Sequence, residues 1–289
     1  MPVQDLNDKL ILKHPKGASA EVLLYGATVT SWKTGGNSNP EPLERLFLSS
    51  KAVLDGSKAV RGGIPVVFPC FGAPTHPDHK NLSQHGFARS ELWKWDGVVM
   101  DNEAGVSVRL VLEPSQKISA IYPKPFRLSY VVTLAEHQLS TDLHVTNTSF
   151  SEQFEFQALF HNYIRAPSDS LFVTPLQGLQ YKDKTDDSLQ GLKTEGRSGV
   201  DVKKFTDSVY TNASQSYTVT WPGGEISIRS QNLKDVVIWN PQAEAGGKMG
   251  DMEEGGWERF VCVEPGYVDG FENVAAGSTW SGGQVLTIN

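Results

Sequence analysis

The sequence predicts an all-β fold, a large antiparallel β-sandwich with few short helices. Two observations support this prediction. Apolar residues mostly take every second position, which is the period of a strand with one packed face and one wet face. Turns rich in Gly, Pro, Asn and Asp separate these short segments, and long stretches of helical periodicity are scarce.

Residues 126–145 show the strand period most clearly. Apolar side chains alternate from Phe126 to Leu134, the pattern breaks at residues 135–138, and it resumes from Leu139 to Val145. This arrangement predicts a β-hairpin. The same period predicts further short strands at residues 106–112, 217–221, 226–228, 236–239, 260–263 and 285–288.

Strand patterns continue at an even density along the chain, so we expect a single domain over residues 1–289. That length is sufficient to bury a substantial core. The polar segment 182–204 and the Gly-rich segment 244–256 interrupt the strand pattern, and both are expected to be surface loops.

The composition limits the partners that the protein could bind. A net charge of −7, without any run of Lys or Arg, argues against nucleic acid and anionic membrane surfaces. The first residues lack a basic start followed by an apolar stretch, and no stretch is long enough to span a bilayer. We therefore expect a cytoplasmic protein that holds any anion with a few placed side chains.

The cysteines and the paired histidines do not predict a metal site. Cys70 and Cys262 lie far apart in apolar surroundings, so we expect reduced, buried packing residues. His76 and His79 are closely spaced, but no Cys or carboxylate arrangement nearby completes a site. The Pro and Asp beside them indicate an exposed loop.

The segment 153–165 divides into two faces if it forms a strand. One face is apolar and is expected to fill the core; it consists of Phe154, Phe156, Ala158 and Phe160. The opposite face mixes polar and bulky groups, namely Glu155, Gln157, Leu159, His161 and Tyr163. This second face is either ordinary solvent-facing surface or the floor of a sugar-binding groove.

Glu264 ends the apolar strand predicted at residues 260–263 and precedes a Pro-Gly pair. A carboxylate in this position is expected to be at least partly buried, and it then needs a hydrogen-bond or charge partner. It could cap a turn. Burial against aromatic residues would also make it a useful proton acceptor or donor near neutral pH.

Residues 60–72, VRGGIPVVFPCFG, predict an ordered loop that carries Arg61 at its start. Pro65 and Pro69 lack the backbone donor that a central strand needs. The Gly-Gly pair matches neither nucleotide-binding pattern, and no Lys-Ser or Lys-Thr follows it, so a phosphate-binding loop of that kind is not expected.

Residues 82–89, LSQHGFAR, place Gln84, His85 and Arg89 around a glycine turn. Arg61 and Arg89 could together clamp a phosphate through charge-assisted bonds worth roughly 1.5–3 kcal/mol each. Each arginine could equally be a structural residue paired with an acid. Asp207 has the spacing of an ordinary turn residue.

Five motifs together resemble one enzyme family. VRGGIPVVFPCFG, SQHGFAR, FQALFHNYIR, DVVIWNP and FVCVEPGYV occur here in the order and approximate spacing found in the glucose-6-phosphate 1-epimerases. That family is part of the galactose mutarotase-like β-sandwich proteins, and the resemblance extends from about Tyr25 to the C-terminus. It implies a galactose mutarotase-like supersandwich and a monomer.

The resemblance also implies roles for individual residues. His161 and Glu264 match the catalytic histidine and glutamate of the family. Arg61 and Arg89 match two basic residues of the substrate site. Gln84 and His85 match residues beside these two arginines. Asp207 matches the acid that contacts a sugar hydroxyl.

The function implied is the interconversion of the α and β anomers of glucose 6-phosphate and related aldohexose 6-phosphates. Glu264 would act as the base at O1 and His161 as the acid at O5, so the reaction needs no cofactor and no metal. The loop GGIPVVFP favours the phosphorylated-sugar branch. An aldose 1-epimerase for free sugars and a non-catalytic carbohydrate-binding sandwich are the alternatives.

Overall fold

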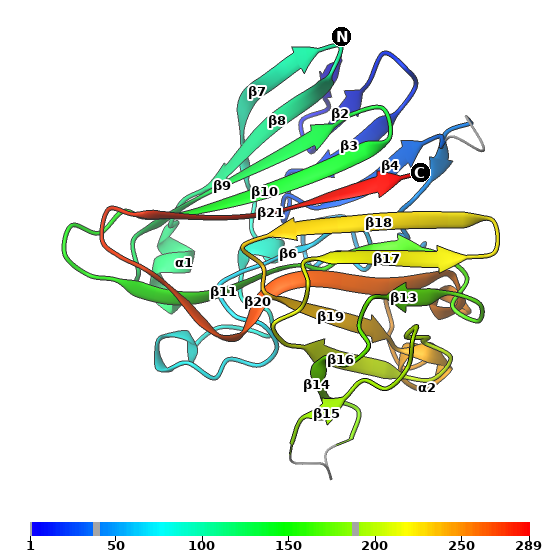
Figure 1. The fold of residues 1–289 in the computed structure, drawn as a ribbon. Helices are drawn as coiled ribbons and strands as arrows, with labels where there is room; N and C mark the ends of the chain where they lie inside the picture. The colour runs from blue at the N-terminus through cyan, green and yellow to red at the C-terminus, as the bar shows by residue number, and fades with distance from the viewer. Residues whose placement is uncertain (1, 37–40, 187–190) are drawn as a thin grey trace.

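The computed structural model describes residues 2–36, 41–186 and 191–289. In these ranges the strands form one five-stranded and two eight-stranded sheets, and every neighbouring pair within them is antiparallel (Figure 1). The α-helices of the same ranges are two short segments, α1 (Gln116–Ile121) and α2 (Gln242–Gly246). The predicted all-β class is confirmed.

The first eight-stranded sheet has the order β13-β17-β18-β21-β10-β9-β8-β7. Its strands are β7 (Lys94–Asn102), β8 (Gly105–Leu112), β9 (Phe126–Leu134), β10 (Gln138–Asn147), β13 (Phe172–Thr174), β17 (Ser216–Trp221), β18 (Gly224–Gln231) and β21 (Thr279–Ile288). The hairpin predicted from the alternating residues is confirmed as β9 and β10, whose register pairs Leu134 with Leu139.

The second eight-stranded sheet has the order β15-β14-β16-β19-β20-β11-β6, and β12 pairs with β20 beside this path. Its strands are β6 (Val66–Val67), β11 (Phe154–Phe160), β12 (Tyr163–Arg165), β14 (Gln180–Asp183), β15 (Lys193–Thr194), β16 (Thr206–Tyr210), β19 (Asp235–Asn240) and β20 (Phe260–Val274). This sheet carries most of the candidate site residues.

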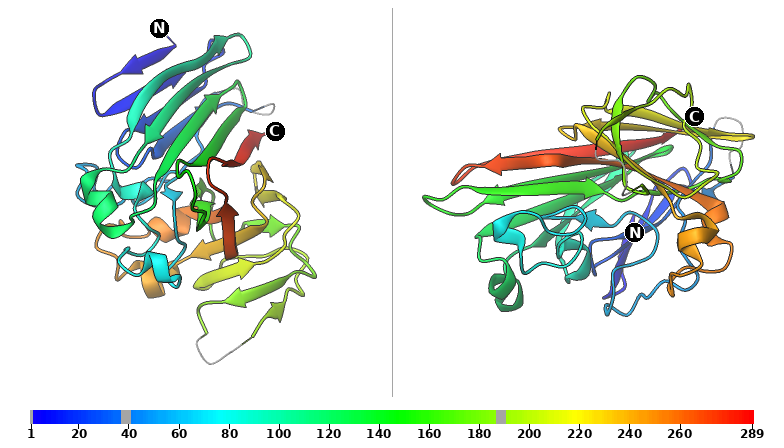
Figure 2. Two further views of the ribbon diagram at one scale, coloured as in Figure 1. Left: turned by 90° about the vertical axis from the view of Figure 1, so that its left-hand side faces the viewer. Right: turned by 90° about the horizontal axis from the view of Figure 1, so that it is seen from below.

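The smaller sheet contains β1 (Val3–Asp5), β2 (Lys9–Lys13), β3 (Ser19–Leu23), β4 (Val29–Thr34) and β5 (Leu43–Glu44). These N-terminal strands, blue in the views of Figure 2, lie beside the β7–β8 end of the first large sheet. Short 3-10 helices occur at η1 (Pro77–His79), η2 (Ala88–Ser90) and η3 (Gly256–Arg259).

The main core lies between the two large sheets. The rings of Tyr130 in β9 and Phe160 in β11 have centroids 6.1 Å apart, and those of Phe156 and Trp280 are 5.2 Å apart. As predicted, the apolar face of β11 is buried in this core. Because the large aromatic side chains of β11 face inward, the other face of this strand is available to line a site.

The segment 60–72 is not entirely a loop. Val66 and Val67 form β6 and pair with Phe160 and Leu159, since the two prolines stand outside this two-residue strand. Phe68 of this segment lies against the turn at residues 82–89, where Gly86 has a positive φ and an added Cβ would overlap the Phe68 backbone. Glycine is therefore required at that point.

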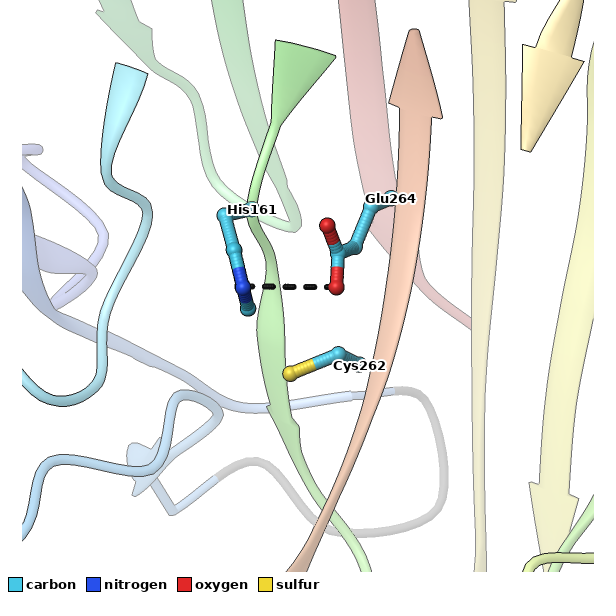
Figure 3. Close-up of side chains that lie close together, drawn as sticks. All are labelled: His161, Cys262 and Glu264. Carbon is cyan, nitrogen blue, oxygen red and sulfur yellow. Dashed lines mark ion pairs between the residues drawn. The ribbon is translucent and has the colours of Figure 1, made fainter. Parts of the chain in front are cut away.

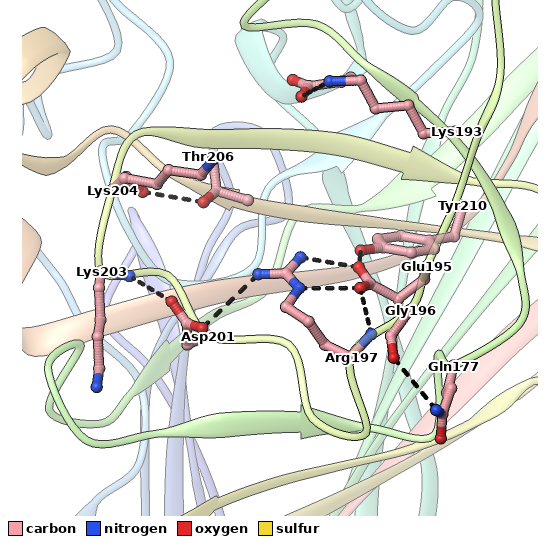
Figure 4. A network of polar contacts seen from close by, with 11 residues as sticks. Gln177, Lys193, Glu195, Gly196, Arg197, Asp201, Lys203, Lys204, Thr206 and Tyr210 are labelled. Carbon is pink, nitrogen blue, oxygen red and sulfur yellow. Dashed lines mark hydrogen bonds and ion pairs between the residues drawn. The ribbon is translucent and has the colours of Figure 1, made fainter.

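The prediction of a surface loop at 182–204 is wrong for its ends, while residues 187–190 lie outside the described part. Strands β14 and β15 form a hairpin there. Glu195 is buried, and its carboxylate accepts hydrogen bonds from Arg197 at 2.8 and 2.9 Å and from the Tyr210 hydroxyl at 2.7 Å (Figure 4). The bond from Tyr210 of β16 ties the buried Glu195 carboxylate, and with it the polar segment, to the sheet.

Two further loop predictions need correction. The segment 244–256 includes the end of α2, and its Asp251 and Met252 are buried because Asp251 pairs with Arg61. His79 is also buried, against Tyr122, and a ring nitrogen approaches the Glu155 carbonyl oxygen at 3.2 Å. Among the described residues, no helix has the length and apolar character required to cross a membrane.

Candidate active site

His161 occupies a break between two strands. β11 ends at Phe160 and β12 begins at Tyr163, and both pair with the long strand β20. Across the break, the backbone carbonyl oxygen of Asn162 accepts a hydrogen bond from the Val263 backbone amide. The side-chain amide of Asn162 donates a hydrogen bond to the Val263 carbonyl oxygen. Asn162 thus maintains the connection to β20 while His161 leaves the strand register.

Glu264 lies inside β20 rather than at its end. The strand continues through Pro265, and Glu264 is paired with Val237 of β19. The sequence prediction placed the end of the strand here because the Pro-Gly pair resembled a turn. The interior position fixes the carboxylate more firmly than a turn would, because β20 has hydrogen-bonded neighbours on both sides.

The side chains of His161 and Glu264 point toward each other (Figure 3). Nδ1 of His161 is 3.4 Å from Oε1 of Glu264, and the residues are 8% and 1% exposed. Burial raises the pKa of Glu264 well above its ordinary value. The pKa of His161 lies well below its ordinary value. Burial is the largest cause, and the nearby His85 and Arg89 add to it. Burial therefore favours the pair with a protonated carboxyl and a neutral imidazole.

One cavity of about 250 Å³ brings all seven predicted site residues together. They are Arg61, Gln84, His85, Arg89, His161, Asp207 and Glu264. The remaining lining consists of Phe71, Lys184, Val237, Trp239 and Met249. The polar face of the segment 153–165 is thus not plain surface, since His161 faces this cavity.

Arg61 forms part of a fixed network on one wall. Its guanidinium donates to the Tyr163 hydroxyl at 3.1 Å and to Asp251 Oδ1 at 3.1 Å, and Lys58 also contacts Asp251 at 2.8 Å. The pKa of Arg61 is raised, most strongly by the Tyr163 hydroxyl and less strongly by Asp251. The structure therefore combines the two possibilities left open for Arg61, because it pairs with an acid and also faces the cavity.

Arg89 reaches the same cavity from η2. Its guanidinium donates to the Gln84 carbonyl oxygen at 2.9 Å, which leaves other N–H groups available. Burial lowers the pKa of Arg89, but an arginine keeps its charge in proteins. His85 accepts a hydrogen bond at Nδ1 from the Gly72 amide at 3.2 Å, and burial holds its pKa well below the ordinary value.

Asp207 lies in β16, paired with Trp239, and is not a turn residue. Its carboxylate is 3.7 Å from the Lys184 ammonium, which lies 4.8 Å from the centre of the Phe71 ring. Burial raises the pKa of Asp207. Two oppositely charged groups therefore lie together in the cavity lining, where they could contact sugar hydroxyls or a phosphate.

Gln157 has a supporting position. It belongs to the predicted polar face, but a register irregularity lies between Phe156 and Ala158. Its amide nitrogen donates to the Val268 and Gly270 carbonyl oxygens, and its amide oxygen accepts from the Phe71 backbone. Gln157 thereby holds the end of the 60–72 segment against the sheet.

Sequence reasoning did not identify Lys184, Asp251 or Trp239. Lys184 and Asp251 belong to polar segments that read as solvated loops, and only tertiary pairing reveals their position. The position of Trp239 could have been found from the sequence. It is two residues from Val237 in a predicted strand, so the two side chains lie on the same face, and both line the cavity.

Comparison with known proteins identifies the class. The chain matches the aldose 1-epimerase family over residues 8–287. A Cenchrus ciliaris protein provisionally named glucose-6-phosphate 1-epimerase is 31% identical, over 95% of this chain and 83% of the relative. An Escherichia coli protein with the same provisional name is 29% identical, over 92% and 85%.

Solved structures agree in fold. The crystal structure of a provisionally named mutarotase from Salmonella typhimurium has a TM-score of 0.84 at 24% identity, covering 99% of this chain and 92% of that one. A Synechocystis protein has a TM-score of 0.80 at 19% identity, with 100% and 98% coverage. The fold is thus that of the mutarotases. The chain belongs to the aldose 1-epimerase family, a family of sugar-processing epimerases.

Proposed function

We propose that the protein interconverts the α and β anomers of aldohexose 6-phosphates, glucose 6-phosphate among them. The observation that supports this proposal is the composition of a single cavity. A buried acid–base pair, His161 and Glu264, lies within about 250 Å³ of space that three cationic side chains also line. The pair suits proton transfer at a sugar hemiacetal, and the cations suit a phosphate dianion.

Anomer exchange requires an acid and a base that lie side by side, because O1 and O5 are bonded to the same carbon of the sugar. Glu264 removes the proton from the O1 hydroxyl, and His161 delivers a proton to O5 as the C1–O5 bond breaks. The open-chain aldehyde then rotates about C1–C2. On closure His161 takes the proton from the O5 hydroxyl and Glu264 returns one to O1, so both groups regain their starting states.

The cations offer a reason for preferring a phosphorylated sugar. Arg89 and Arg61 contribute to the lowered pKa of His161. A phosphate dianion bound to Arg61, Arg89 and Lys184 offsets this positive charge, so substrate binding favours the protonated imidazole that ring opening requires. The phosphate then contributes both to binding and to the protonation state of the acid.

Polarimetry on freshly dissolved α-glucose 6-phosphate tests the proposal. We expect the optical rotation to reach its equilibrium value faster in proportion to enzyme concentration, in a buffer of low catalytic power. A rate equal to that of the buffer would indicate a non-catalytic sugar-binding protein. Acceleration with glucose alone would indicate an aldose 1-epimerase for free sugars.

A further inference from the structure

A buried thiol lies directly beside the acid–base pair. Cys262 and Glu264 are two residues apart on β20, so their side chains emerge on the same face of the strand, and His161 approaches from the break between β11 and β12 (Figure 3). One ligand atom from each of the three side chains lies within 4.8 Å of the other two. In the described part of the chain, no other group of His, Cys, Asp and Glu has this spacing.

Two of these three side chains have polar atoms without a hydrogen bond. In the described structure, Nδ1 of His161 and Oε2 of Glu264 are buried and have no hydrogen-bond partner. Buried polar atoms are almost always hydrogen-bonded, and an exception calls for a missing ligand or a chemical role. These atoms belong to side chains that face each other, so a single ion could satisfy both.

We propose that His161, Cys262 and Glu264 form a site for a zinc ion that inhibits the enzyme. In a tetrahedral site, nitrogen and oxygen ligands about 2.1 Å from zinc are about 3.4 Å apart. In the structure Nδ1 of His161 is 3.4 Å from Oε1 of Glu264, the carboxylate oxygen bonded to the same carbon as the unsatisfied Oε2. A sulfur ligand would lie about 3.6 Å from each, so a sulfur within 4.8 Å of both atoms has to move by about 1.3 Å or less. The cavity leaves the fourth position open to water or substrate.

The charges of the ligands are compatible with a divalent ion despite the neighbouring arginines. Zinc with one thiolate and one carboxylate has no net charge, so Arg61 and Arg89 meet a neutral complex. Burial raises the pKa of the Cys262 thiol well above its ordinary value. Binding must therefore release the thiol proton to solvent, which a coordinated metal brings about. A soft thiolate beside an imidazole selects zinc over magnesium or calcium.

The inhibitory consequence rests on the proposed function. Zinc bound here would take up Nδ1 of His161 and one oxygen of Glu264 and neutralise the carboxylate, which makes the proposed base much weaker and holds the proposed acid in place. Sugar and ion would occupy the same part of the cavity, and inhibition should be competitive with glucose 6-phosphate. Binding of the ion itself does not depend on the enzymatic activity and can be measured separately.

Cobalt(II) titration of the full chain tests the site, because thiolate-bound cobalt has an ultraviolet charge-transfer band. We expect one ion per chain with this band in the wild-type protein, displaced by zinc. Cys262→Ser should lose the band, and so should Glu264→Gln, which keeps the side-chain shape. Cys70→Ser is the matched control, because Cys70 is the other buried cysteine, and it should keep both band and activity.

A competing surface site needs its own control, because His76 lies 3.0 Å from Glu155. His76→Gln should leave the charge-transfer band unchanged. The proposal is overturned if wild type shows no band, if the band survives Cys262→Ser or Glu264→Gln, or if it is lost in Cys70→Ser. Should Cys262→Ser fail to fold, Glu264→Gln decides alone.

Activity measurements test the inhibitory part. We expect zinc to stop anomer exchange in wild type and in Cys70→Ser, and to have little effect on the remaining rate of Cys262→Ser. Full activity with zinc bound would overturn inhibition. A protein that binds cobalt with the band but never exchanges anomers would refute the proposed function and support the metal site.

Discussion

The protonation of His161 and Glu264 is set by the low polarity around them. Burial favours the neutral form of each group, a protonated carboxyl and an unprotonated imidazole. The combination that the proposed mechanism requires, carboxylate with imidazolium, contains the same number of protons. Under that proposal, transfer of one proton within the pair, aided by a bound phosphate, generates this form without exchange with solvent.

Removing either member of the pair should abolish most of the activity without unfolding the protein. We expect Glu264→Gln and His161→Ala to lower the exchange rate by ~10²–10⁴-fold, the contribution of one placed acid or base. Nuclear magnetic resonance exchange measurements and thermal unfolding curves check rate and stability together. A variant with near-wild-type turnover would remove that residue from the mechanism.

The pH dependence of kcat/KM should separate the two roles. For the wild type, kcat/KM plotted against pH should be bell-shaped. The reactive form is lost at low pH, when the carboxylate gains a proton, and at high pH, when the imidazolium loses one. In His161→Gln only Glu264 titrates, so the residual rate should rise with pH and then stay level. The midpoint should exceed the ordinary carboxylate value, because burial raises the pKa of Glu264.

The opposite variant should show the opposite profile. In Glu264→Gln the residual rate should fall as pH rises, with a midpoint below the ordinary imidazole value, because burial lowers the pKa of His161. If the high-pH limb persists in His161→Gln, the titrating acid is another group, and His85 becomes the first candidate, since its ring centre is 6.0 Å from that of His161.

Arg89 should distinguish phosphorylated from free sugar. Arg89→Ala is expected to weaken glucose 6-phosphate by roughly 1.5–3 kcal/mol, about ten- to a hundred-fold, and to change the KM for glucose little. Added salt should also weaken the binding of glucose 6-phosphate to the wild type. Arg109→Ala is the control, because Arg109 pairs with Asp96 on an exposed strand face. Equal losses on both sugars would show that Arg89 supports the ring hydroxyls or the fold.

At the scale of elements, strands were easier to predict than the segments that complete the site. Alternation predicts the β9–β10 hairpin and both faces of β11, because each strand has one core face. The same rule failed at Glu264, where Pro265 continues the strand instead of ending it. Lys184 and Asp251 were missed because polar loop sequences do not show which tertiary partner will bury them.

The loop around Asp251 should act on catalysis through Arg61. Asp251→Asn leaves Arg61 without its ionic partner, and we expect a several-fold higher KM for glucose 6-phosphate with little change in kcat. The same change should lower stability by about 1–3 kcal/mol, because it disrupts a buried charge pair. In Asp251→Glu the KM should lie between the values of Asp251→Asn and the wild type. Glu253→Gln is the control on the same loop, because Glu253 pairs with Arg259 and not with Arg61.

An unchanged KM in Asp251→Asn would contradict this account of the loop. It would show that the Tyr163 hydroxyl alone holds the Arg61 guanidinium in place.

At the scale of the whole molecule, the site depends on contacts between distant segments of the chain. Residues 61, 89, 161, 207 and 264 meet in one cavity because β16, β19, β20, β11 and β6 follow one another in one sheet, while the segment around β6 carries Arg61 and the turn at 82–89 carries Arg89. Sequence periodicity contains no information on this strand order. The seven candidate site residues could be named together only because several motifs resembled a known family, and their roles stay predictions. The single domain and the monomer stay predictions.

Anomer exchange of glucose 6-phosphate and glucose, measured in one tube by two-dimensional exchange spectroscopy, tests the central claim most directly. Both sugars then meet the same active enzyme, pH and ionic strength. We predict exchange cross-peaks between the two C1 protons of glucose 6-phosphate at enzyme concentrations that leave the glucose peaks unconnected, and their loss with Glu264→Gln. Cross-peaks of equal or greater strength for glucose would contradict the assignment of Arg61, Arg89 and Lys184 to a phosphate.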